Sequence, residues 1–305
     1  MTIGFISHPD CARHEMGSGH PECPARLGAI EDRMIASGLH SVLRHYDAPL
    51  ATRQQLRRVH RPEYVDHIFE SAPSDGLAWI DPDTAMNPHT LAAALRAAGA
   101  AVHGVDLVMR NETSTVFCCV RPPGHHAERA RAMGFCFFNN VAVGAAHALA
   151  MHKLERVAIV DFDVHHGNGT EDIFRREPRV MLCSTFQHPF YPFSGAGNMP
   201  GHIINVPLAA GSSGGAFAQA VEERWLPALE EFRPQLILIS AGFDAHVEDD
   251  MAGLALTEPD YAWVTSQIRS VAERHAQGRI VSILEGGYAL SALGRSVAAH
   301  LQALL

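Results

Sequence analysis

The stretch Asp161-Phe-Asp-Val-His-His-Gly-Asn-Gly-Thr170 follows Val157-Ala-Ile-Val160, a short apolar run that predicts a buried strand. Side chains alternate along an extended segment, so we expect Asp161, Asp163 and His165 to point to one side. Two carboxylates and an imidazole that converge on one spot are typical metal ligands. A strand end whose polar groups face water is the alternative. The repeated spacing of two residues, followed by a second histidine and two glycines, favours the metal site.

Along the rest of the chain, apolar strands alternate with helices, which predicts an α/β fold with a parallel sheet covered on both faces. No repeat or linker divides the sequence, so we expect residues 1–305 to form a single domain. Sites in such sheets lie beyond the carboxyl ends of the strands, where several polar or glycine-rich motifs are expected to meet. The expected strands span residues 3–7, 115–120, 157–160, 180–184, 203–208, 236–240 and 280–284, and the expected helices 25–37, 62–70, 87–109, 139–154, 216–232, 257–276 and 290–304.

The composition is ordinary for a soluble enzyme. Of the 305 residues, 47% are hydrophobic, and the formal net charge of −9 argues against a nucleic-acid partner. The six cysteines form no Cys-x-x-Cys pair, which is typical of reduced thiols in a cytoplasmic protein. The first residues lack a secretory pattern, and no run approaches the roughly 18 apolar residues of a membrane helix. We therefore expect a cytoplasmic protein with no membrane partner, and its oligomeric state stays open.

The candidate metal ligands come from two strand ends. Asp163 and His165 are the first two, and Asp244, which follows the strand at 236–240, is the natural third. Such a set leaves coordination positions open, as a catalytic metal requires. Taken alone, Asp244 is equally typical of a helix cap or a solvated turn. The ligand types suit zinc, and ferrous iron and cobalt share them.

A histidine pair, His125-His126, follows the strand at 115–120 and a Pro-Pro-Gly turn. Histidines tuned near neutral pH are the usual proton carriers. Single loop histidines are more often surface groups, but two together on the rim of a metal site are more specific. Each needs an acceptor that orients it, and Asp161 and Asn168 are the candidates.

Tyr288 follows two glycines, which allow close backbone approach and could present its phenol to the site. A phenol beside a polarised carbonyl donates a hydrogen bond to the developing oxyanion. A core tyrosine is the alternative. Gly134-Phe135 and Phe190-Tyr191 could wall a narrow slot, although aromatic residues at such places are more often plain core.

Five motifs together resemble the zinc-dependent histone deacetylase family. They occur in the family's order between about Phe5 and Tyr288, and Asn168 with the Glu-Gly-Gly-Tyr form resembles the class II branch and its bacterial deacetylase-like and acetylpolyamine amidohydrolase relatives. The resemblance implies the arginase-like α/β fold with an eight-stranded, predominantly parallel sheet. The motifs are Arg121-Pro-Pro-Gly-His-His126, Gly134-Phe-Cys-Phe-Phe-Asn-Asn140, Asp161 to Thr170, Ser240-Ala-Gly-Phe-Asp244 and Glu285-Gly-Gly-Tyr288.

The same resemblance implies roles for single residues. One zinc ion per chain would lie on Asp163, His165 and Asp244. His126 would act as general base and then acid, with His125 as its electrostatic partner, and Tyr288 would complete the oxyanion site.

The resemblance further implies one or two structural potassium ions and the lining of a tunnel for the acyl-lysine stem. Arg26 falls near the family's internal acetate exit. The first potassium site corresponds to Asp161, Asp163, His165, Ser184 and Thr185, the second includes Phe174 and Val180, and the tunnel walls correspond to Gly134, Phe135 and Tyr191.

Two departures from family patterns bear on the substrate. Met251 occupies the rim position where a polyamine-specific branch places a glutamate, so the sequence gives no direct support for polyamine preference. Tyr288, being tyrosine rather than histidine, argues against the weakly active class IIa type. The resemblance thus implies hydrolysis of an acetyl amide on a primary-amine stem such as acetyl-lysine, releasing acetate.

Three competing functions stay open. An acetylpolyamine or other small-amide amidohydrolase is the nearest. An arginase-type ureohydrolase shares the fold but needs two manganese ions and more Asp ligands. A sensor that binds acyl ligands without turnover is disfavoured by the intact histidine pair and Tyr288. The loops at 8–24, 72–90 and 187–202 are expected to shape the mouth of the site.

Overall fold

One eight-stranded sheet forms the centre of the computed structural model, which describes residues 2–197 and 199–305. Its strands are β1 (Ile3–Ser7), β2 (Leu43–Asp47), β5 (Thr115–Cys118), β6 (Val157–Asp161), β7 (Val180–Gln187), β8 (Ile203–Leu208), β9 (Leu236–Ala241) and β10 (Ile280–Leu284). They lie in the order β2-β1-β5-β10-β9-β6-β7-β8, and every neighbouring pair is parallel. The predicted parallel eight-stranded sheet is confirmed.

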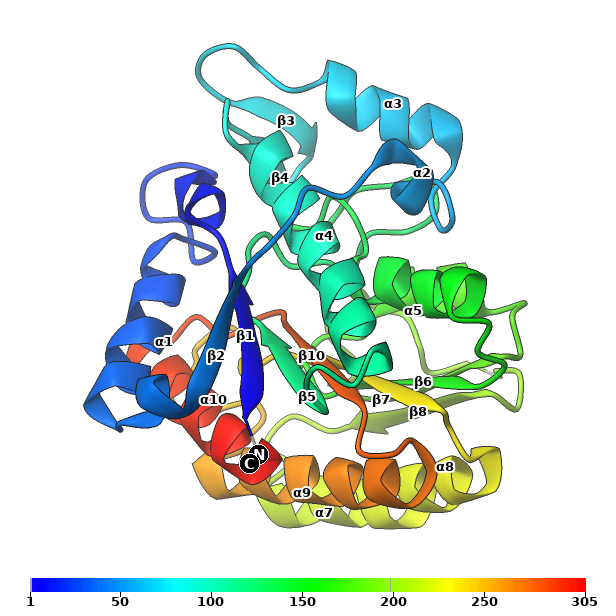
Figure 1. Ribbon diagram of the computed structural model, residues 1–305. Coiled ribbons are helices and arrows are strands. Elements are labelled where there is room, and N and C mark those ends of the chain that lie inside the picture. Colours follow the sequence, from blue (N-terminus) through cyan, green and yellow to red (C-terminus); the bar gives the residue numbers. More distant parts are fainter. Residues whose placement is uncertain (1, 198) are drawn as a thin grey trace.

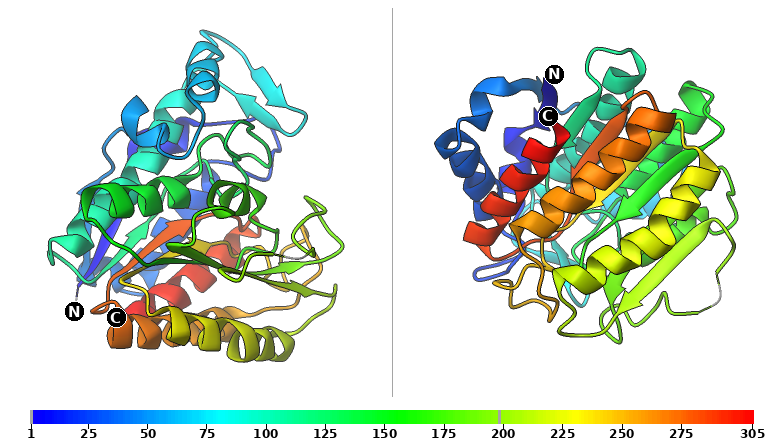
Figure 2. Two further views of the ribbon diagram at one scale, coloured as in Figure 1. Left: turned by 90° about the vertical axis from the view of Figure 1, so that its right-hand side faces the viewer. Right: turned by 90° about the horizontal axis from the view of Figure 1, so that it is seen from below.

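Helices cover both faces of this sheet (Figure 1). Two of them, α4 (Thr90–Met109) and α5 (Asn140–Met151), lie side by side on one face. Seen from below, α10 (Leu290–Leu304), α9 (Glu258–His275) and the α7–α8 segment cover the other face (Figure 2). The remaining helices are α1 (Ala25–Ala36), α2 (Arg53–Leu56), α3 (Pro62–Glu70), α6 (Asn168–Phe174), α7 (Gly214–Ala220) and α8 (Leu226–Phe232), with 3-10 turns at Pro9–Arg13 and Leu39–Val42.

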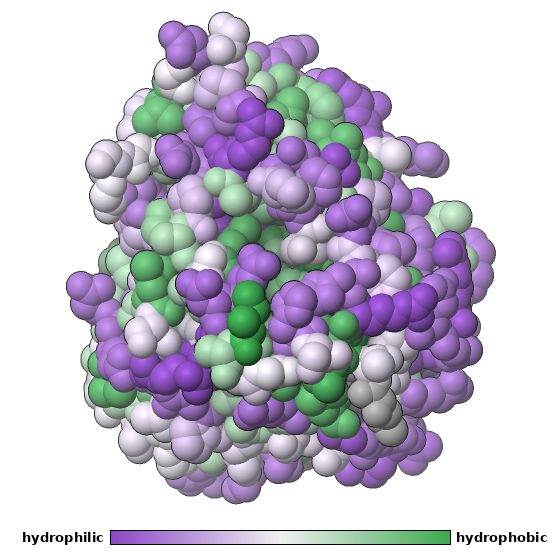
Figure 3. Space-filling model, turned by 60° about the vertical axis from the view of Figure 1, so that its left-hand side comes forward, coloured by the Kyte–Doolittle hydropathy of each residue, from purple (hydrophilic) through white to green (hydrophobic). Residues whose placement is uncertain are grey.

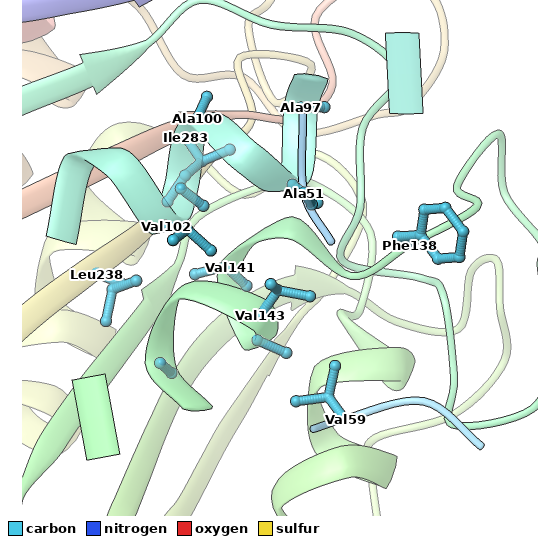
Figure 4. Close-up of a cluster of buried hydrophobic side chains, with 14 of the residues drawn as sticks. Ala51, Val59, Ala97, Ala100, Val102, Phe138, Val141, Val143, Leu238 and Ile283 are labelled. Atoms are coloured by element: carbon cyan, nitrogen blue, oxygen red, sulfur yellow. The ribbon is translucent and has the colours of Figure 1, made fainter. Parts of the chain in front are cut away.

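The hydrophobic core lies between the sheet and each helical layer. Every residue of β5, β6, β7, β9 and β10 is buried. On the α4–α5 side, small and branched side chains of the two helices pack on Leu238 of β9 and Ile283 of β10 (Figure 4). Short side chains on α4, such as Ala97 and Ala100, let the helix approach the sheet closely.

Helix α4 corrects one expectation, because it is long and apolar enough to span a membrane by length and composition. In the fold, 67% of that apolar window is buried inside the protein. Hydrophilic residues predominate on the face shown in Figure 3, where hydrophobic residues form only small groups. The apolar length of α4 is therefore accounted for by core packing.

Three local expectations were wrong. Strand β2 was missed because it is an edge strand in which only Leu43 is buried, so it carries no apolar run. The expected loop at 72–90 contains an antiparallel hairpin, β3 (Ala78–Asp81) and β4 (Thr84–Met86). The expected helix at 216–232 is interrupted by a π-helical turn at Val221–Trp225, just before Pro227, which has no backbone N–H to donate.

Candidate active site

The carboxyl ends of four neighbouring strands, β5, β10, β9 and β6, carry the candidate site. The histidine pair follows β5, Tyr288 follows β10, Asp244 follows β9, and the Asp163–His165 segment follows β6. Since parallel strands end at the same edge, residues as far apart in sequence as His125 and Tyr288 are brought together there. The sequence placed all four motifs at strand ends, and the structure brings them to one place.

Asp163, His165 and Asp244 form a buried cluster whose potential ligand atoms all lie within 4.8 Å of one another. His165 Nδ1 lies 3.0 Å from Asp163 Oδ1 and 3.3 Å from Asp244 Oδ2. Other carboxylate oxygens are held by the backbone, because Val164 N–H donates to Asp244 Oδ1 at 2.9 Å and Gly286 N–H to Asp163 Oδ2 at 2.9 Å. The backbone thus fixes both carboxylates beside one imidazole nitrogen.

Two observations fit a metal ion at this cluster. Within the described part of the chain, Asp244 Oδ2 is a buried oxygen with no hydrogen-bond partner, and such an oxygen is costly unless something pairs with it. Glycines also make room for the carboxylates, since a Cβ at Gly286 would lie 2.0 Å from Asp244 Oδ2 and one at Gly242 would lie 2.1 Å from Asp163 Oδ2. Two carboxylates and an imidazole are a set that divalent zinc accepts.

The pKa values of the two carboxyl groups in the cluster are shifted in opposite directions. Burial and the neighbouring Asp163 raise the pKa of Asp244 to about 6. Burial acts on Asp163 as well, but the positive charge of His125 and the contacts with His165 outweigh it and lower the pKa of Asp163. A bound divalent cation would keep both carboxylates ionised, which the ion-free cluster does not favour.

His125 and His126 lie with their ring centroids 4.0 Å apart, and each ring has the acceptor that the sequence proposed. His125 Nδ1 lies 3.0 Å from Asp161 Oδ2, and His126 Nδ1 lies 2.8 Å from Asn168 Oδ1. Burial opposes protonation of His125, but the carboxylates of Asp163 and Asp161 outweigh it and raise its pKa. Burial and the charge of His125 lower the pKa of His126. The pair therefore combines one charged and one neutral imidazole, and the neutral one can accept a proton.

Tyr288 is held at the rim of the same cavity by a residue that the sequence did not single out. This residue is Asp249. Its Oδ2 accepts two hydrogen bonds, from the N–H of Tyr288 at 2.6 Å and from the N–H of Ala289 at 3.0 Å. The ring of Tyr288 lies edge-on to Phe135, with centroids 6.2 Å apart. Asp249 lies in the loop after β9, and no local pattern marks it as a partner of residues about 40 positions away.

Arg26 was expected near an acetate exit, and the structure shows it as a buried support for the Tyr288 segment. Its Nε donates to Gly287 O at 2.6 Å and its Nη2 to Glu285 O at 2.5 Å. Its Nη1 donates to Glu22 Oε1 at 3.1 Å, and Glu22 also pairs with Arg121, which precedes the histidine pair in sequence. Glu22 thus connects the two segments that carry Tyr288 and the histidines.

Glu285 makes a second connection between strand ends. Its buried Oε2 accepts the N–H groups of Gly124 at 2.6 Å and His125 at 3.1 Å, and its Oε1 accepts from Ser240 Oγ at 3.1 Å. The carboxylate therefore ties β10 to the turn after β5 and to β9. The sequence included Glu285 in a motif without assigning it a role.

A cavity of about 240 Å³ reaches His165 of the metal cluster and His126 of the histidine pair, and all the tunnel residues expected from sequence line it. Its lining consists of Asp83, His126, Gly134, Phe135, His165, Phe190, Tyr191, Met251 and Tyr288. A larger cavity of about 510 Å³ between α1 and β2 is lined by neither the metal cluster nor the histidine pair.

The wall at Gly134-Phe135 is held by the hairpin that sequence reasoning missed. Gly134 N–H donates to Asp83 Oδ1 at 3.0 Å and Phe135 N–H to Thr84 Oγ1 at 3.0 Å. Gly134 and Phe135 both have a positive φ, of 57° and 68°, and this backbone conformation is strained for a phenylalanine. A Cβ at Gly134 would lie 2.4 Å from His126 Cδ2, so only glycine allows this approach to the histidine.

The residues expected to bind the first potassium ion include Asp163 and His165 of the metal cluster and continue onto the neighbouring strand β7. Ser184 of β7 is paired in register with Asp161 of β6, and Thr185 is the next residue along β7. The buried Ser184 hydroxyl has no hydrogen-bond partner among the described residues. Phe174 and Val180, at the end of α6 and the start of β7, are both buried. Potassium at either place stays a prediction.

Comparison with known proteins places this geometry in a family. The histone deacetylase-like amidohydrolase of Pseudomonas aeruginosa is 39% identical over 292 residues, covering 93% of this chain and 75% of the relative. The polyamine deacetylase HDAC10 of Homo sapiens is 35% identical over 326 residues, covering 100% of this chain and 48% of the human protein. The crystal structure of the HDA15 HD domain superposes with a TM-score of 0.94 at 32% identity, over 100% of this chain and 90% of that one. The family model for the histone deacetylase domain matches residues 20–304, and this chain therefore belongs to the histone deacetylase family, as a hydrolase that acts on amides.

Proposed function

We propose that this chain is a zinc-dependent amidohydrolase that removes acetyl or related acyl groups from acetyl-lysine-type amines and releases acetate. One observation carries the proposal: His165 of the Asp163–His165–Asp244 cluster, His126 of the histidine pair and Tyr288 all line one cavity of about 240 Å³. A ligand set with open positions, a neutral imidazole and a phenol are together the groups that amide hydrolysis needs.

Asp163, His165 and Asp244 would hold the zinc ion, which when bound polarises a carbonyl and makes water more acidic. His126 would take the proton of the attacking water, because its ring is buried, neutral and oriented by Asn168. The same imidazole would then protonate the leaving amine. His125, paired with Asp161, would supply positive charge beside the reacting atoms. Tyr288 would donate to the oxyanion as the tetrahedral intermediate forms.

The lining of the cavity bears on the substrate. Phe135, Phe190 and Tyr191 supply aromatic walls suited to an aliphatic stem. Met251 at the rim brings no charge, which favours a neutral stem over a polyamine. Asp83 is the one acidic side chain among the lining residues, and it favours a second candidate, an acetylated small polyamine, whose free amines are cationic at neutral pH. The human relative is itself called a polyamine deacetylase.

The decisive experiment compares initial rates on an acetyl-lysine peptide and on acetylputrescine, with bound metal measured on the same sample. We expect acetate release from both and a higher kcat/KM on the peptide. A higher kcat/KM on acetylputrescine would replace the first candidate by the second. Acetate release that persists after all bound zinc has been removed would contradict the metal-dependent mechanism. As a control for contaminating hydrolases, the His126→Ala variant should lose activity on both substrates.

A further inference from the structure

A second group of metal-ligand side chains lies away from the active site, formed by Asp106, His147 and His152. Their potential ligand atoms all lie within 4.8 Å of one another, as they do in the active-site cluster. Asp106 is in the last turn of α4, His147 is in the last half of α5, and His152 directly follows α5. The group thus joins the ends of two adjacent helices.

These helix ends lie at the edge of the sheet opposite the active site. Helix α4 leads into β5 and helix α5 leads into β6, so each helix ends beside the amino end of a strand. The catalytic motifs follow the carboxyl ends of the same strands. Residues at the amino edge of such sheets usually serve stability rather than chemistry. We therefore look to this group for a structural role.

The distances within the group are close to those of a metal site. Asp106 Oδ1 lies 2.9 Å from His147 Nε2 and 2.7 Å from His152 Nε2. Two ligands at about 2.0–2.1 Å from a tetrahedral zinc are roughly 3.3 Å apart. Asp106 needs to separate from each imidazole by only about half an ångström to admit the ion, which is within the reach of rotamer adjustment. His147 is buried, whereas Asp106 and His152 are partly exposed and leave access for an ion and for water ligands.

Local charge favours a cation at this place. The carboxyl ends of α4 and α5 both point to the group, and each carries the partial negative charge of a helix dipole. Burial lowers the pKa of His147, so its ring is neutral near pH 7, as a metal ligand must be. Burial would raise the pKa of Asp106, but hydrogen bonds from His147 and His152 outweigh it and lower that pKa. The carboxylate is therefore ionised.

Arg58 is the one contact that opposes metal binding. Its Nη1 lies 2.9 Å from His147 Nδ1, and because a guanidinium only donates, the neutral ring carries its proton on Nε2. Coordination through Nε2 moves that proton to Nδ1, so Arg58 has to turn away. Arg58 is partly exposed and free to do so. Removing its side chain should therefore strengthen metal binding rather than weaken it.

We propose that Asp106, His147 and His152 bind a second divalent transition-metal ion of the zinc type, which links the carboxyl ends of α4 and α5. One carboxylate and two imidazoles are a ligand set that zinc prefers over magnesium or calcium. Water completes the coordination, because the described structure brings no fourth protein ligand to the group. The site is structural, and it does not depend on the proposed amidohydrolase activity.

The experiment equilibrates the whole chain with buffered free Zn²⁺ and measures zinc per chain and Tm. We expect two equivalents in the wild type and one in His152→Gln, with equal acetate release. At zinc 100-fold above the dissociation constant, Tm of the wild type should rise by roughly 5 °C more than Tm of His152→Gln. The matched control is His67→Gln, which removes an exposed imidazole from α3 and should keep two equivalents.

Arg58→Ala provides a second variant with the opposite expectation. It should bind the second equivalent about tenfold more tightly, because the competing hydrogen bond to His147 is gone. The proposal is overturned if wild type and His152→Gln take up the same number of equivalents, or if Arg58→Ala weakens the second equivalent. Failure of acetate release with two equivalents bound would count against the proposed enzyme function and leave this site standing.

Discussion

The two edges of the sheet use the same residue types in different ways. At the carboxyl edge, Asp163, His165 and Asp244 are all buried, and Asp244 Oδ2 has no hydrogen-bond partner among the described residues beyond its 3.3 Å ion-pair contact with His165 Nδ1. At the amino edge, Asp106 accepts bonds from two histidines and lies 3.6 Å from Arg110. The first group is unsatisfied without an ion, whereas the second is satisfied with or without one.

This difference shows why the active site is demanding to build. Buried charges without partners cost several kcal/mol, so the surrounding backbone must hold them in place. Backbone hydrogen bonds hold the carboxyl edge together. The N–H of Gly286 donates to Asp163, and the carboxylates of Asp249 and Glu285 accept N–H groups of the neighbouring loops. At the amino edge, partly exposed side chains bond one another directly. Mutations should therefore have much larger effects at the carboxyl edge.

The largest effect is expected from Gly286→Ala. The new methyl carbon would lie 2.0 Å from Asp244 Oδ2 and 2.7 Å from Asp163 Oδ2, so both carboxylates must move. We expect loss of the active-site metal and a fall in kcat/KM of about 10³-fold or more, since metal assistance is worth several kcal/mol. Metal content and kcat/KM are measured together. Gly28→Ala, whose Cβ would meet nothing within 4 Å, is the matched control. Full metal and normal activity in Gly286→Ala would refute the packing argument.

Next in size is Tyr288→Phe. Without the phenol, the oxyanion loses one donor, and kcat should fall by about 10²- to 10³-fold at unchanged metal content. Steady-state kinetics with elemental analysis provides the measurement. Tyr46→Phe removes a phenol from the edge strand β2 and should leave kcat unchanged. Unchanged turnover in Tyr288→Phe would remove this residue from the mechanism.

Asp249→Ala tests whether the Tyr288 segment needs its support. Two N–H groups, of Tyr288 and Ala289, lose their acceptor, and displacement of the phenol by about 1 Å can cost up to about 10²-fold. We expect kcat to fall by roughly 10- to 100-fold with little change in KM. Asp249→Asn keeps an acceptor oxygen and should recover most of the loss. A fall in stability with no change in kcat would instead assign Asp249 a purely structural role.

The smallest effect is expected at the amino edge. Asp106→Asn in metal-free buffer weakens the bonds to two histidines, and about 1 kcal/mol of stability corresponds to a Tm lower by roughly 2–4 °C. Acetate release should be unchanged, because the group lies at the edge opposite the active site. Thermal unfolding and activity are measured in parallel. A loss of activity comparable to that of Tyr288→Phe would show that the two edges are not independent.

The sheet and the position of the polar motifs at its strand ends were predictable because their signals are local. Strands such as Val157–Asp161 are continuous apolar runs, and the polar motifs follow them directly in sequence. The supporting residues were not predictable, because their partners are distant. Asp249 bonds Tyr288 across 39 positions, and Asp106 meets His147 and His152 across 41 and 46. Nothing in the composition around these residues indicates the pairing.

Secondary-structure elements with little apolar content also could not be predicted from the sequence. Strand β2 owes its pairing to β1 rather than to its own residues, of which only Leu43 is buried. The hairpin at 78–86 follows a polar, glycine-containing segment that is typical of a loop. Both are set by tertiary contacts that override local propensity.

The shared carboxylate of Glu22 has a consequence for how this chain can change over generations. It pairs at once with Arg26 and Arg121, and all three side chains are fully buried. A substitution at any one of them leaves a buried charge without its partner, so single substitutions are strongly disfavoured. Simultaneous replacement of the whole trio by apolar side chains removes the unpaired charge, although the carbonyls of Gly287 and Glu285 then lose the donors that Arg26 supplies. Drift at these positions should therefore be epistatic, with combined variants better tolerated than the sum of their parts.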